Sequence, residues 1–397
     1  MNDVIITKVN GGLGRRNPSN DSICGLLANG VAVSAGVQLS TIYTLKTVDD
    51  AVSLKIDADY DKNNSVLVYE HINEFFRINP NGELRLMLVA QSVSYADMLD
   101  KTNENAKKLL RESNGDIKVL AVAYNPSTQV TDFTACDAAI PKAQELATEE
   151  YSQHRPVQIV LEGAGFDQAS PVDFRAKNAA DVSVMVGQSL SVAKREISSA
   201  TPYSKYAAIG TCLGMVSKRA VNENIGWVNQ SNAYGGTILS AGINNTAISS
   251  ISQTVLDDLN TKGTIFFTTH TGVAGIYFND SHTATTITSD FAYIENNRTI
   301  NKAVRAIRTK LLPRLNEPVV VDADAGTLAQ EVVQSYESDG RSALEELLRN
   351  GEVSSIDVYV DPAQNILTSS ELQVKFEVVP TGTYRKISVT IGFSNPF

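Results

Sequence analysis

The sequence predicts a mixed α/β protein. The expected architecture is an α/β body with a parallel or mixed sheet, then a C-terminal domain, with extended β-strand arms at both ends of the chain. Continuous apolar runs of strand length occur at residues 117–124, 157–161 and 182–186, as in strands that are covered on both faces. A helical pattern at 138–153 separates the first two runs, and such alternation builds a parallel sheet. Residues 372–378 and 387–393 alternate apolar and polar side chains, which is typical of half-exposed strands.

Length and composition limit the function classes. The 397 residues allow two or three domains, and 43% hydrophobic with 20% charged residues allow a large core. A net charge of −10 and a pI near 5.0 argue against a nucleic-acid partner. No secretion signal opens the chain and no apolar run is long enough for a membrane span, so we expect no membrane insertion. Three widely spaced cysteines indicate free thiols in a reducing compartment.

Residues 1–24 are expected to form an N-terminal arm. Val4, Ile5, Ile6 and Val9 make a short strand-like run, and Gly11, Gly12 and Gly14 make the following segment a flexible linker. A strand on such a tether can reach beyond its own domain. From these residues alone, the simpler interpretation is a first strand followed by an irregular loop within the same subunit.

The expected α/β body spans residues 25–270. Residues 30–57 have a β-rich composition. Helices are expected at 65–77, 97–112, 138–153, 205–221 and 248–259. Besides the three apolar runs, strands are expected at 84–90 and, as a pair, at 264–269 and 272–278.

The C-terminal domain, expected over 271–397, contains a basic helix at 290–316. Its apolar residues recur at steps of three and four on one face: Ile300, Val304, Ile307, Leu311 and Leu315. Arg298, Lys302, Arg305 and Arg308 fall on the other side, and the 17 residues from Arg298 to Arg314 hold six cations and no acid. A charge run is usually a solvated helix face. The alternative is a surface that meets an acidic partner.

The chain is expected to end in a helix and strands. Residues 327–349 have a helical pattern that opens with a capping box of Thr327 and Gln330 and is expected to break or kink at Asp339-Gly340. A strand is expected at 355–360. The final strand lies in residues 384–397, here called the C-terminal arm, with Ile387, Val389, Ile391 and Phe393 on its apolar face. The pattern fits two interpretations equally well: the strand pairs with a neighbouring subunit, or it closes its own domain.

The strongest sign of enzymatic chemistry is the run from Gly210 to Gly214. It matches a nucleophile elbow with Cys212 in place of serine, and His270 or His282 would be the partner base. A cysteine-dependent α/β hydrolase is therefore the alternative function, although a small buried cysteine in a helix is the commoner case. The four histidines show no metal spacing, and residues 10–14 lack the Lys-Ser/Thr of a phosphate loop. We expect no catalytic residues, no metal and no cofactor.

The order of these parts resembles the contractile tail sheath proteins of myophages and of related contractile injection systems, in particular a divergent phage-type branch. Residues 293–328 and 371–393 carry the resemblance, with support from 47–52 and 69–88. It implies a structural protein that is not an enzyme. Such subunits stack as hexameric rings in a helical polymer around an inner tube, and contraction drives the tube through a target envelope.

The resemblance also implies partners and roles for named residues. The partners are further copies of this chain, the inner tail tube protein, and baseplate and tail terminator proteins. The two arms would donate strands to neighbours, with the glycine linker absorbing rotation. Arg298, Lys302, Arg305 and Arg308 would face the tube. The location would be a virion tail or injection apparatus assembled in the bacterial cytoplasm. Another virion component is a further alternative, although tube proteins are typically smaller and mostly β.

Overall fold

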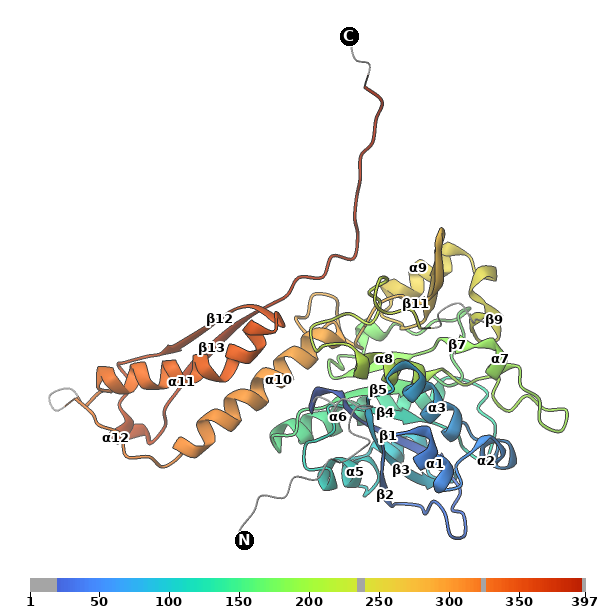
Figure 1. Ribbon diagram of the computed structural model, residues 1–397, viewed down its shortest axis with the longest axis horizontal. Helices are drawn as coiled ribbons and strands as arrows, with labels where there is room; N and C mark the ends of the chain where they lie inside the picture. The colour runs from blue at the N-terminus through green and yellow to red at the C-terminus, as the bar shows by residue number, and fades with distance from the viewer. Residues whose placement is uncertain (1–19, 234–239, 323–325, 395–397) are drawn as a thin grey trace, which may run out of the picture. The chain divides into compact units, whose positions relative to one another are not determined.

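The computed structural model describes residues 20–233, 240–322 and 326–394 (Figure 1). Within them the chain forms two compact units, Met1–Arg305 and Ala306–Phe397. The predicted residues Val4, Ile5, Ile6, Val9, Gly11, Gly12 and Gly14 lie outside the described residues.

The first unit is built on a six-stranded sheet with the order β2-β3-β1-β4-β5-β6. Its strands are β1 (Ile23–Gly30), β2 (Ile42–Leu45), β3 (Glu83–Ala90), β4 (Val119–Ala123), β5 (Gln158–Glu162) and β6 (Val182–Met185). All neighbours pair in parallel except β2, which joins β3 antiparallel. Every residue of β1, β4 and β5 is buried. The predicted α/β class with a parallel or mixed sheet is therefore confirmed.

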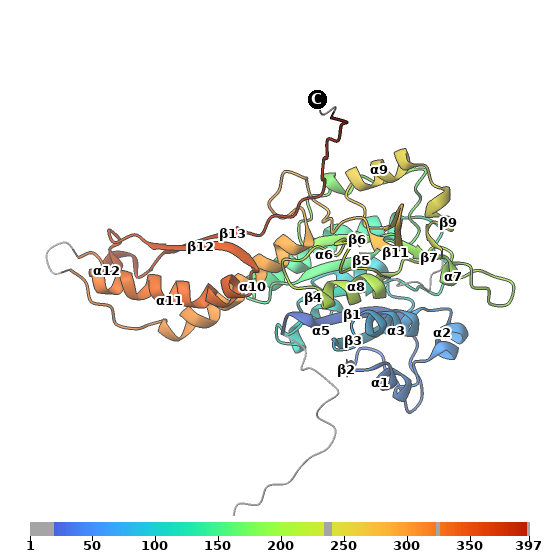
Figure 2. The same ribbon diagram turned by 45° about the horizontal axis from the view of Figure 1, so that its top comes forward.

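Helices cover both faces of this sheet (Figures 1 and 2). α3 (Val68–Ile78) and α8 (Ile209–Lys218) pack on each other and on β1, while α5 (Ala106–Glu112) packs on β1 and α6 (Thr134–Ser152) on β5 and β6. The chain runs from β1 to β3 in one direction across the sheet and from β3 to β4 in the other. Because such crossovers are right-handed, the intervening helices fall on opposite faces.

Gly210 and Gly214 lower the helix propensity of α8, but they allow α8 to pack closely against α3. A Cβ at Gly210 would lie 2.3 Å from the carbonyl oxygen of His71, and one at Gly214 would lie 2.9 Å from that of Phe75. The backbones of the two helices are thus in contact, and a larger side chain at either position has no room.

Shorter elements complete the first unit. The helices are α1 (Val48–Ser53), α2 (Ala58–Asn64), α4 (Tyr95–Leu99), α7 (Leu190–Ala193), α9 (Gln253–Thr261), η1 (Asn20–Ser22), η2 (Phe174–Ala176) and η3 (Ile248–Ser250). A small sheet joins β7 (Gln188–Ser189), β8 (Ala241–Ile243) and β9 (Thr246–Ala247), and β10 (Phe267–His270) pairs with β11 (Val273–Phe278) as an antiparallel hairpin.

Several predicted boundaries differ from these elements. Most of residues 30–57 is not β, because Thr47 and Asp50 form a capping box that starts α1. The helix expected at 97–112 is two helices, since Asp100 has extended backbone. The predicted N-terminal arm ends inside the sheet, because β1 starts at Ile23. The boundary expected between residues 270 and 271 falls within the β10–β11 hairpin.

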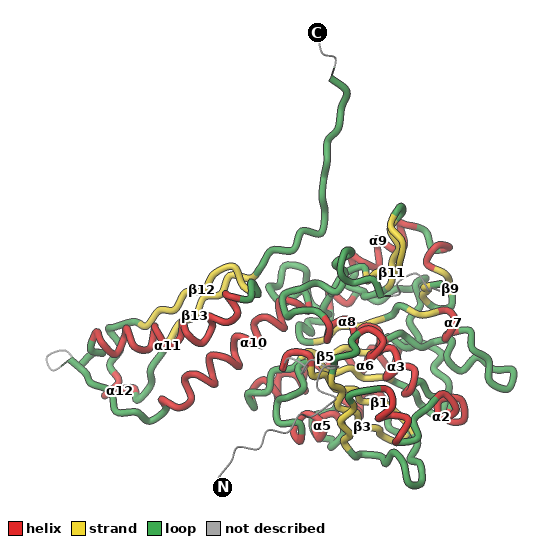
Figure 3. The backbone as a smooth tube through the Cα atoms, viewed as in Figure 1, coloured by secondary structure: helices red, strands yellow, loops and turns green. Residues whose placement is uncertain are grey.

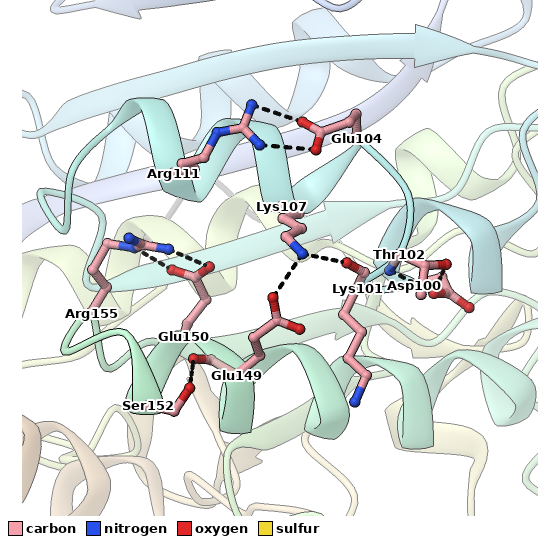
Figure 4. A network of polar contacts seen from close by, with 10 residues as sticks. All are labelled: Asp100, Lys101, Thr102, Glu104, Lys107, Arg111, Glu149, Glu150, Ser152 and Arg155. Atoms are coloured by element: carbon pink, nitrogen blue, oxygen red, sulfur yellow. Dashed lines mark hydrogen bonds and ion pairs between the residues drawn. The ribbon is translucent and has the colours of Figure 1, made fainter.

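A polar network ties α5 to α6 on the outside of the first unit (Figure 4). The ion pair Lys107–Glu149, at 2.7 Å, joins the two helices, while Arg111–Glu104 at 2.8 Å and Arg155–Glu150 at 2.6 Å each join one helix to the loop beside it. The Glu150 side chain is buried, whereas Arg111 and Glu104 are about half exposed. Exposed pairs of this kind stabilise a fold by only about 0–1 kcal/mol each. The exposed pair Arg111–Glu104 therefore adds little stability, whereas the buried Glu150 carboxylate depends on Arg155 as its partner.

The second unit is a helix packed on a two-stranded sheet (Figure 3). α11 (Gln330–Arg349) covers β12 (Val353–Val360) and β13 (Val374–Pro380), which pair antiparallel, and α12 (Ile366–Ser369) lies in the connection between them. Buried Leu328, Val333, Tyr336 and Val360 form one cluster of its core, and Leu344, Leu347, Val353 and Val358 are buried as well. β13 confirms the first of the two predicted C-terminal strands.

Gly340 does not break α11, contrary to the sequence-based expectation. The helix continues through Asp339-Gly340. A Cβ at Gly340 would lie 2.7 Å from Val358 Cγ1 and 2.9 Å from Phe376 Cε1, so this position has room for glycine but not for a side chain. The expected capping box is also wrong, since the N-cap is Ala329 and has no side-chain cap. Close helix–sheet packing, not chain bending, explains this glycine.

Candidate functional site

The chain passes from the first unit to the second within α10 (Ile294–Leu311), here called the connecting helix, which is followed by η4 (Leu312–Arg314). This is the predicted basic helix, although it ends before Pro313. Its first half is buried and largely polar, with Glu295, Asn297, Arg298 and Asn301 among its buried residues. The predicted apolar face is only half-buried at Ile300, and Leu315 beyond the helix is 71% exposed.

Arg298 is buried, so the prediction that it lies on an exposed face is wrong. Its side chain is 4% exposed, and Nη1 and Nη2 donate to the carbonyl oxygens of Ala220 and Arg219 at 3.0 and 3.1 Å. These carbonyls directly follow α8, where a cation also meets the negative end of the helix dipole. Burial lowers the pKa of the guanidinium below its ordinary value, and nearby Cys24 and Asp21 oppose this shift. Arg298 therefore fastens the connecting helix to the end of α8.

Lys302 and Arg305 share one carboxylate of their own chain. Lys302 Nζ lies 2.8 Å from Asp21 Oδ2, and Arg305 Nη2 lies 3.7 Å from Asp21 Oδ1. Arg305 Nη1 also donates to the carbonyl oxygen of Pro156 at 3.5 Å. Burial lowers the pKa of Arg305 to about 10, with Asp21 acting in the opposite direction. Both cations thus point at the body of the first unit.

The remaining cations of the stretch lie in the second unit. Arg308 is exposed. Lys310 and Arg314 share Asp339 at 3.4 and 2.7 Å, and the Arg314 guanidinium lies 3.8 Å from the centroid of the Tyr336 ring. The cations of residues 298–314 therefore do not form one solvated stripe. A tube contact through the four predicted residues stays a prediction, and Arg308 is the one that is exposed to make it.

The C-terminal arm has no strand over residues 381–394. Its predicted apolar residues are nevertheless highly exposed: Ile387 74%, Val389 80%, Ile391 94% and Phe393 111%. Within the described residues the arm does not close its own domain, because β13 pairs with β12 instead. Four exposed apolar side chains at alternate positions are costly in water and favour burial against a partner.

Cys212 does not sit on a nucleophile elbow. It lies inside α8, after the N-cap residue Ala208, and not at a strand-to-helix turn. Its thiol is fully buried, and burial raises its pKa to about 12, which disfavours the reactive thiolate. The proposed partner His282 has its Nδ1 2.6 Å from Arg175 Nη2 and its Nε2 2.9 Å from Asn260 Oδ1. Its two ring nitrogens are therefore already engaged.

Side chains fill the place where this strand order usually holds a ligand. In doubly wound sheets ligands bind beyond the carboxyl ends of the strands, where the helices switch faces. Here that switch lies between β1 and β4. Asn29, at the end of β1, accepts from the Asn125 N–H at 3.0 Å and donates to the carbonyl oxygens of Ala90 and Val93, while Asn125 Oδ1 accepts from the Leu67 N–H at 3.1 Å. This asparagine plug satisfies two backbone N–H groups and two carbonyl oxygens at the switch point from within the chain.

A buried carboxyl group lies at the next strand end. Glu162, the last residue of β5, accepts from the backbone N–H groups of Tyr124 and Ala207 at 2.7 and 2.9 Å. Burial raises the pKa of Glu162 to about 7, and the two donors oppose this shift. Both oxygens are committed to loop backbone, so Glu162 acts here as a structural clamp.

Among the described residues, no three His, Cys, Asp or Glu side chains are grouped so that they could hold a metal ion. None of the described helices combines the length and apolar character that crossing a membrane requires.

Comparison with protein families identifies the chain. The family model for the N-terminal domain of DUF2586 matches residues 1–282, and the model for the DUF2586 C-terminal domain matches residues 290–397. The chain belongs to the DUF2586 family. The family boundary lies just before the connecting helix, whereas the compact units of this DUF2586 chain divide within it. No curated protein matches the chain.

Solved structures show what fold the DUF2586 chain has. The helical sheath of the anti-feeding prophage in its contracted state matches with a TM-score of 0.64 and 15% identity, covering 98% of both chains. A chain of the six-fold symmetrised baseplate of the same prophage matches at 0.61 and 15%, covering 99% and 100%. The contracted PVC sheath complex of an extracellular contractile injection system matches at 0.59 and 12%, covering 99% and 97%. The DUF2586 chain thus has the fold of contractile sheath proteins over almost its whole length.

Sequence reasoning missed the acidic partners of the basic helix. Asp21 and Asp339 neutralise Lys302, Arg305, Lys310 and Arg314. Asp339 belongs to a predicted helix and Asp21 to a predicted linker, and no local spacing relates either residue to residues 298–314. In the DUF2586 chain these contacts form only once the elements have packed.

Proposed function

We propose that this DUF2586 chain is the structural subunit of a contractile tail sheath. It polymerises as stacked hexameric rings around an inner tube and contracts to drive the tube through a target envelope. The observation that carries the proposal is the near-full-length likeness to the helical sheath of the anti-feeding prophage, at 98% coverage of both chains. The further likeness to a baseplate chain supports assembly next to a baseplate.

The two arms supply the connections between subunits. The C-terminal arm presents Ile387, Val389, Ile391 and Phe393 to solvent, and β12–β13 is a two-stranded sheet with an outer edge on each strand. Addition of an extended segment to such an edge gives directional main-chain hydrogen bonds and buries alternate side chains. A head-to-tail contact of this kind can propagate without closing. The apolar N-terminal residues Val4, Ile5, Ile6 and Val9 would serve a second neighbour in the same way.

The work of contraction comes from the lattice and not from catalysis. Contraction is a switch between two packings of the same subunits, the contracted one lower in free energy. The tube protein would meet the exposed Arg308. Such a contact can guide assembly and still release, because exposed ion pairs contribute only about 0–1 kcal/mol each. The partners are further copies of the chain, the tube, the baseplate and the tail terminator. The site of action is a virion tail or injection apparatus assembled in the bacterial cytoplasm.

Negative-stain electron microscopy of the purified chain tests the proposal. The wild-type chain is expected to form tubes or ring stacks, and a variant that lacks residues 384–397 is expected to stay a folded monomer. Ile391→Asp should also prevent polymers, because a charge would enter the strand interface, whereas the matched control Thr390→Asp places the charge on the other face of the predicted strand. A wild-type chain that stays monodisperse at high concentration would contradict the proposal. Normal polymers from the deletion variant would contradict the role of the arm.

A further inference from the structure

Three elements hold the chain where the N-terminal arm meets the sheet. Ser217 of α8 donates through Oγ to the carbonyl oxygen of Ser22 at 2.8 Å. The backbone N–H of Lys118, just before β4, donates to the carbonyl oxygen of Ile23 at 3.1 Å. Asp21 meets the connecting helix through Lys302 and Arg305. The end of the arm is thus fixed to α8, to the sheet and to α10 within three consecutive residues.

Of these three contacts, the one to the connecting helix is made by a side chain of residues 21–23, whereas Ser22 and Ile23 contribute their backbone carbonyl oxygens. Asp21 is about one-fifth exposed and has two cations of α10 beside it, at 2.8 and 3.7 Å. Lys118 is a third basic residue that interacts with this group. Burial, and next the charge of Arg305, lower the pKa of Lys118 to about 8, while the charges of Asp116 and Asp21 oppose this shift. Loss of the Asp21 carboxylate would leave these cations without their shared anion.

We propose that Asp21 anchors the N-terminal arm to the connecting helix, so that a pull on the arm is carried into α10. This inference rests on the proposed function, since a pull requires a neighbour that holds the arm. Asp21 acts as a positioning residue. Its two ion pairs join the last turn before the sheet to the helix within which the chain passes into the second unit. When a neighbouring subunit pulls on the N-terminal arm, the force then also acts on the connecting helix.

Hydrogen–deuterium exchange on the isolated full-length chain tests the anchor without any assembly. In Asp21→Asn the amides of residues 298–305 are expected to exchange about fivefold faster than in the wild type, because the helix loses a tether. Asp21→Glu keeps the carboxylate and is expected to restore protection. The matched control is Asp116→Asn, since Asp116 pairs with Arg85 at 3.6 Å and not with α10. Equal exchange in Asp21→Asn and the wild type would overturn the anchor, as would an equal effect of Asp116→Asn.

A second variant distinguishes loss of the Asp21 contact from a general loss of the fold. Lys302→Met removes the closer cation from the α10 side and keeps its hydrocarbon stem. It is expected to speed exchange at 298–305 while the amides of β4 and β5 keep their protection. Loss of protection throughout the sheet in both variants would mean that Asp21 is needed for folding, and would overturn a positioning role.

Electron microscopy separates this inference from the proposed function. If the wild type polymerises, Asp21→Asn is expected to give polymers several-fold shorter or fewer than those of Asp21→Glu. Polymers of normal length and yield, combined with faster exchange in α10, would show that the anchor carries no load and would overturn the inference. Failure of the wild type to polymerise would count against the sheath function, while the exchange result would still decide the anchor.

Discussion

Arg298 Nη1 lies 3.0 Å from the carbonyl oxygen of Ala220, so a guanidinium of the connecting helix caps the chain just after α8. We therefore expect Arg298 to stabilise the folded chain. Arg298→Ala is expected to lower the free energy of unfolding by about 2–4 kcal/mol, because it removes the donor of two carbonyl oxygens and leaves a cavity in place of the buried Arg298 side chain. Chemical denaturation of the isolated chain measures the loss.

Arg308 provides the comparison on the same helix. Because Arg308 is exposed, Arg308→Ala is expected to change stability by no more than about 0.5 kcal/mol. Equal losses for the two alanine variants would contradict the difference in their surroundings.

Arg308 is also the best probe of the proposed tube contact. Arg308→Glu is expected to impair assembly of the sheath on tubes while leaving the thermal unfolding midpoint within about 2 °C of the wild type. Co-assembly with the tube protein, followed by electron microscopy, measures the effect. Sheathed tubes at the wild-type yield would mean that Arg308 only faces solvent. Charge reversal at Arg298, Lys302 or Arg305 is not a suitable test of the tube contact, because those residues make contacts within the chain's own fold.

Gly340 tests the packing of the second unit. Gly340→Ala would place a Cβ 2.7 Å from Val358 Cγ1, and overpacking of this kind costs about 1–3 kcal/mol. Faster hydrogen exchange in α11, β12 and β13 is the expected result. Ser342→Ala is the matched control because Ser342 lies on the exposed side of α11. Helix propensity alone would predict that Gly340→Ala stabilises the unit. That result would show that α11 and β12 are packed less closely than the 2.7 Å distance implies.

Cys212 is expected to be inert in the native protein. Its thiol is buried and burial raises its pKa to about 12, so native labelling with an alkylating reagent should be slow and should become fast in denaturant. Mass spectrometry after timed labelling resolves Cys212 from Cys24 and Cys136, which are buried as well. Rapid stoichiometric labelling of Cys212 alone in the native state would return the hydrolase hypothesis to consideration.

His71 gives the protein a defined pH dependence. Burial lowers the pKa of His71 from 6.5 to about 3. Below pH 6.5 the unfolded chain therefore binds a proton that the folded chain does not bind until about pH 3, so His71 costs stability as the pH falls through this window. Burial raises the pKa values of Asp61 and Glu162 to about 7, and these groups act in the opposite direction.

Comparison with His71→Leu isolates the histidine. The difference in unfolding free energy, wild type minus variant, is expected to fall by on the order of 3 kcal/mol between pH 7 and pH 4. Denaturant titrations at several pH values give the two profiles. Parallel profiles would show that His71 is protonated equally in both states.

The strands of the first unit could be predicted because burial on both faces appears directly as an apolar run. β4, β5 and β6 fall within or next to such runs. Glycines were misleading, because Gly210 and Gly340 lower helix propensity locally but are required where α8 meets α3 and where α11 meets β12. Periodicity places Arg298 on a face of its helix, but it cannot reveal that the end of α8 covers that face. The exposed apolar residues of the C-terminal arm could be predicted because alternation needs no tertiary partner.

The asparagine plug has a consequence for the energetics of the proposed sheath. Asn29 and Asn125 close the switch point of the sheet with hydrogen bonds inside one subunit. If the chain forms the proposed sheath, no nucleotide bound at this crevice would supply the energy of contraction. That energy would instead have to be stored in the lattice when the polymer is assembled.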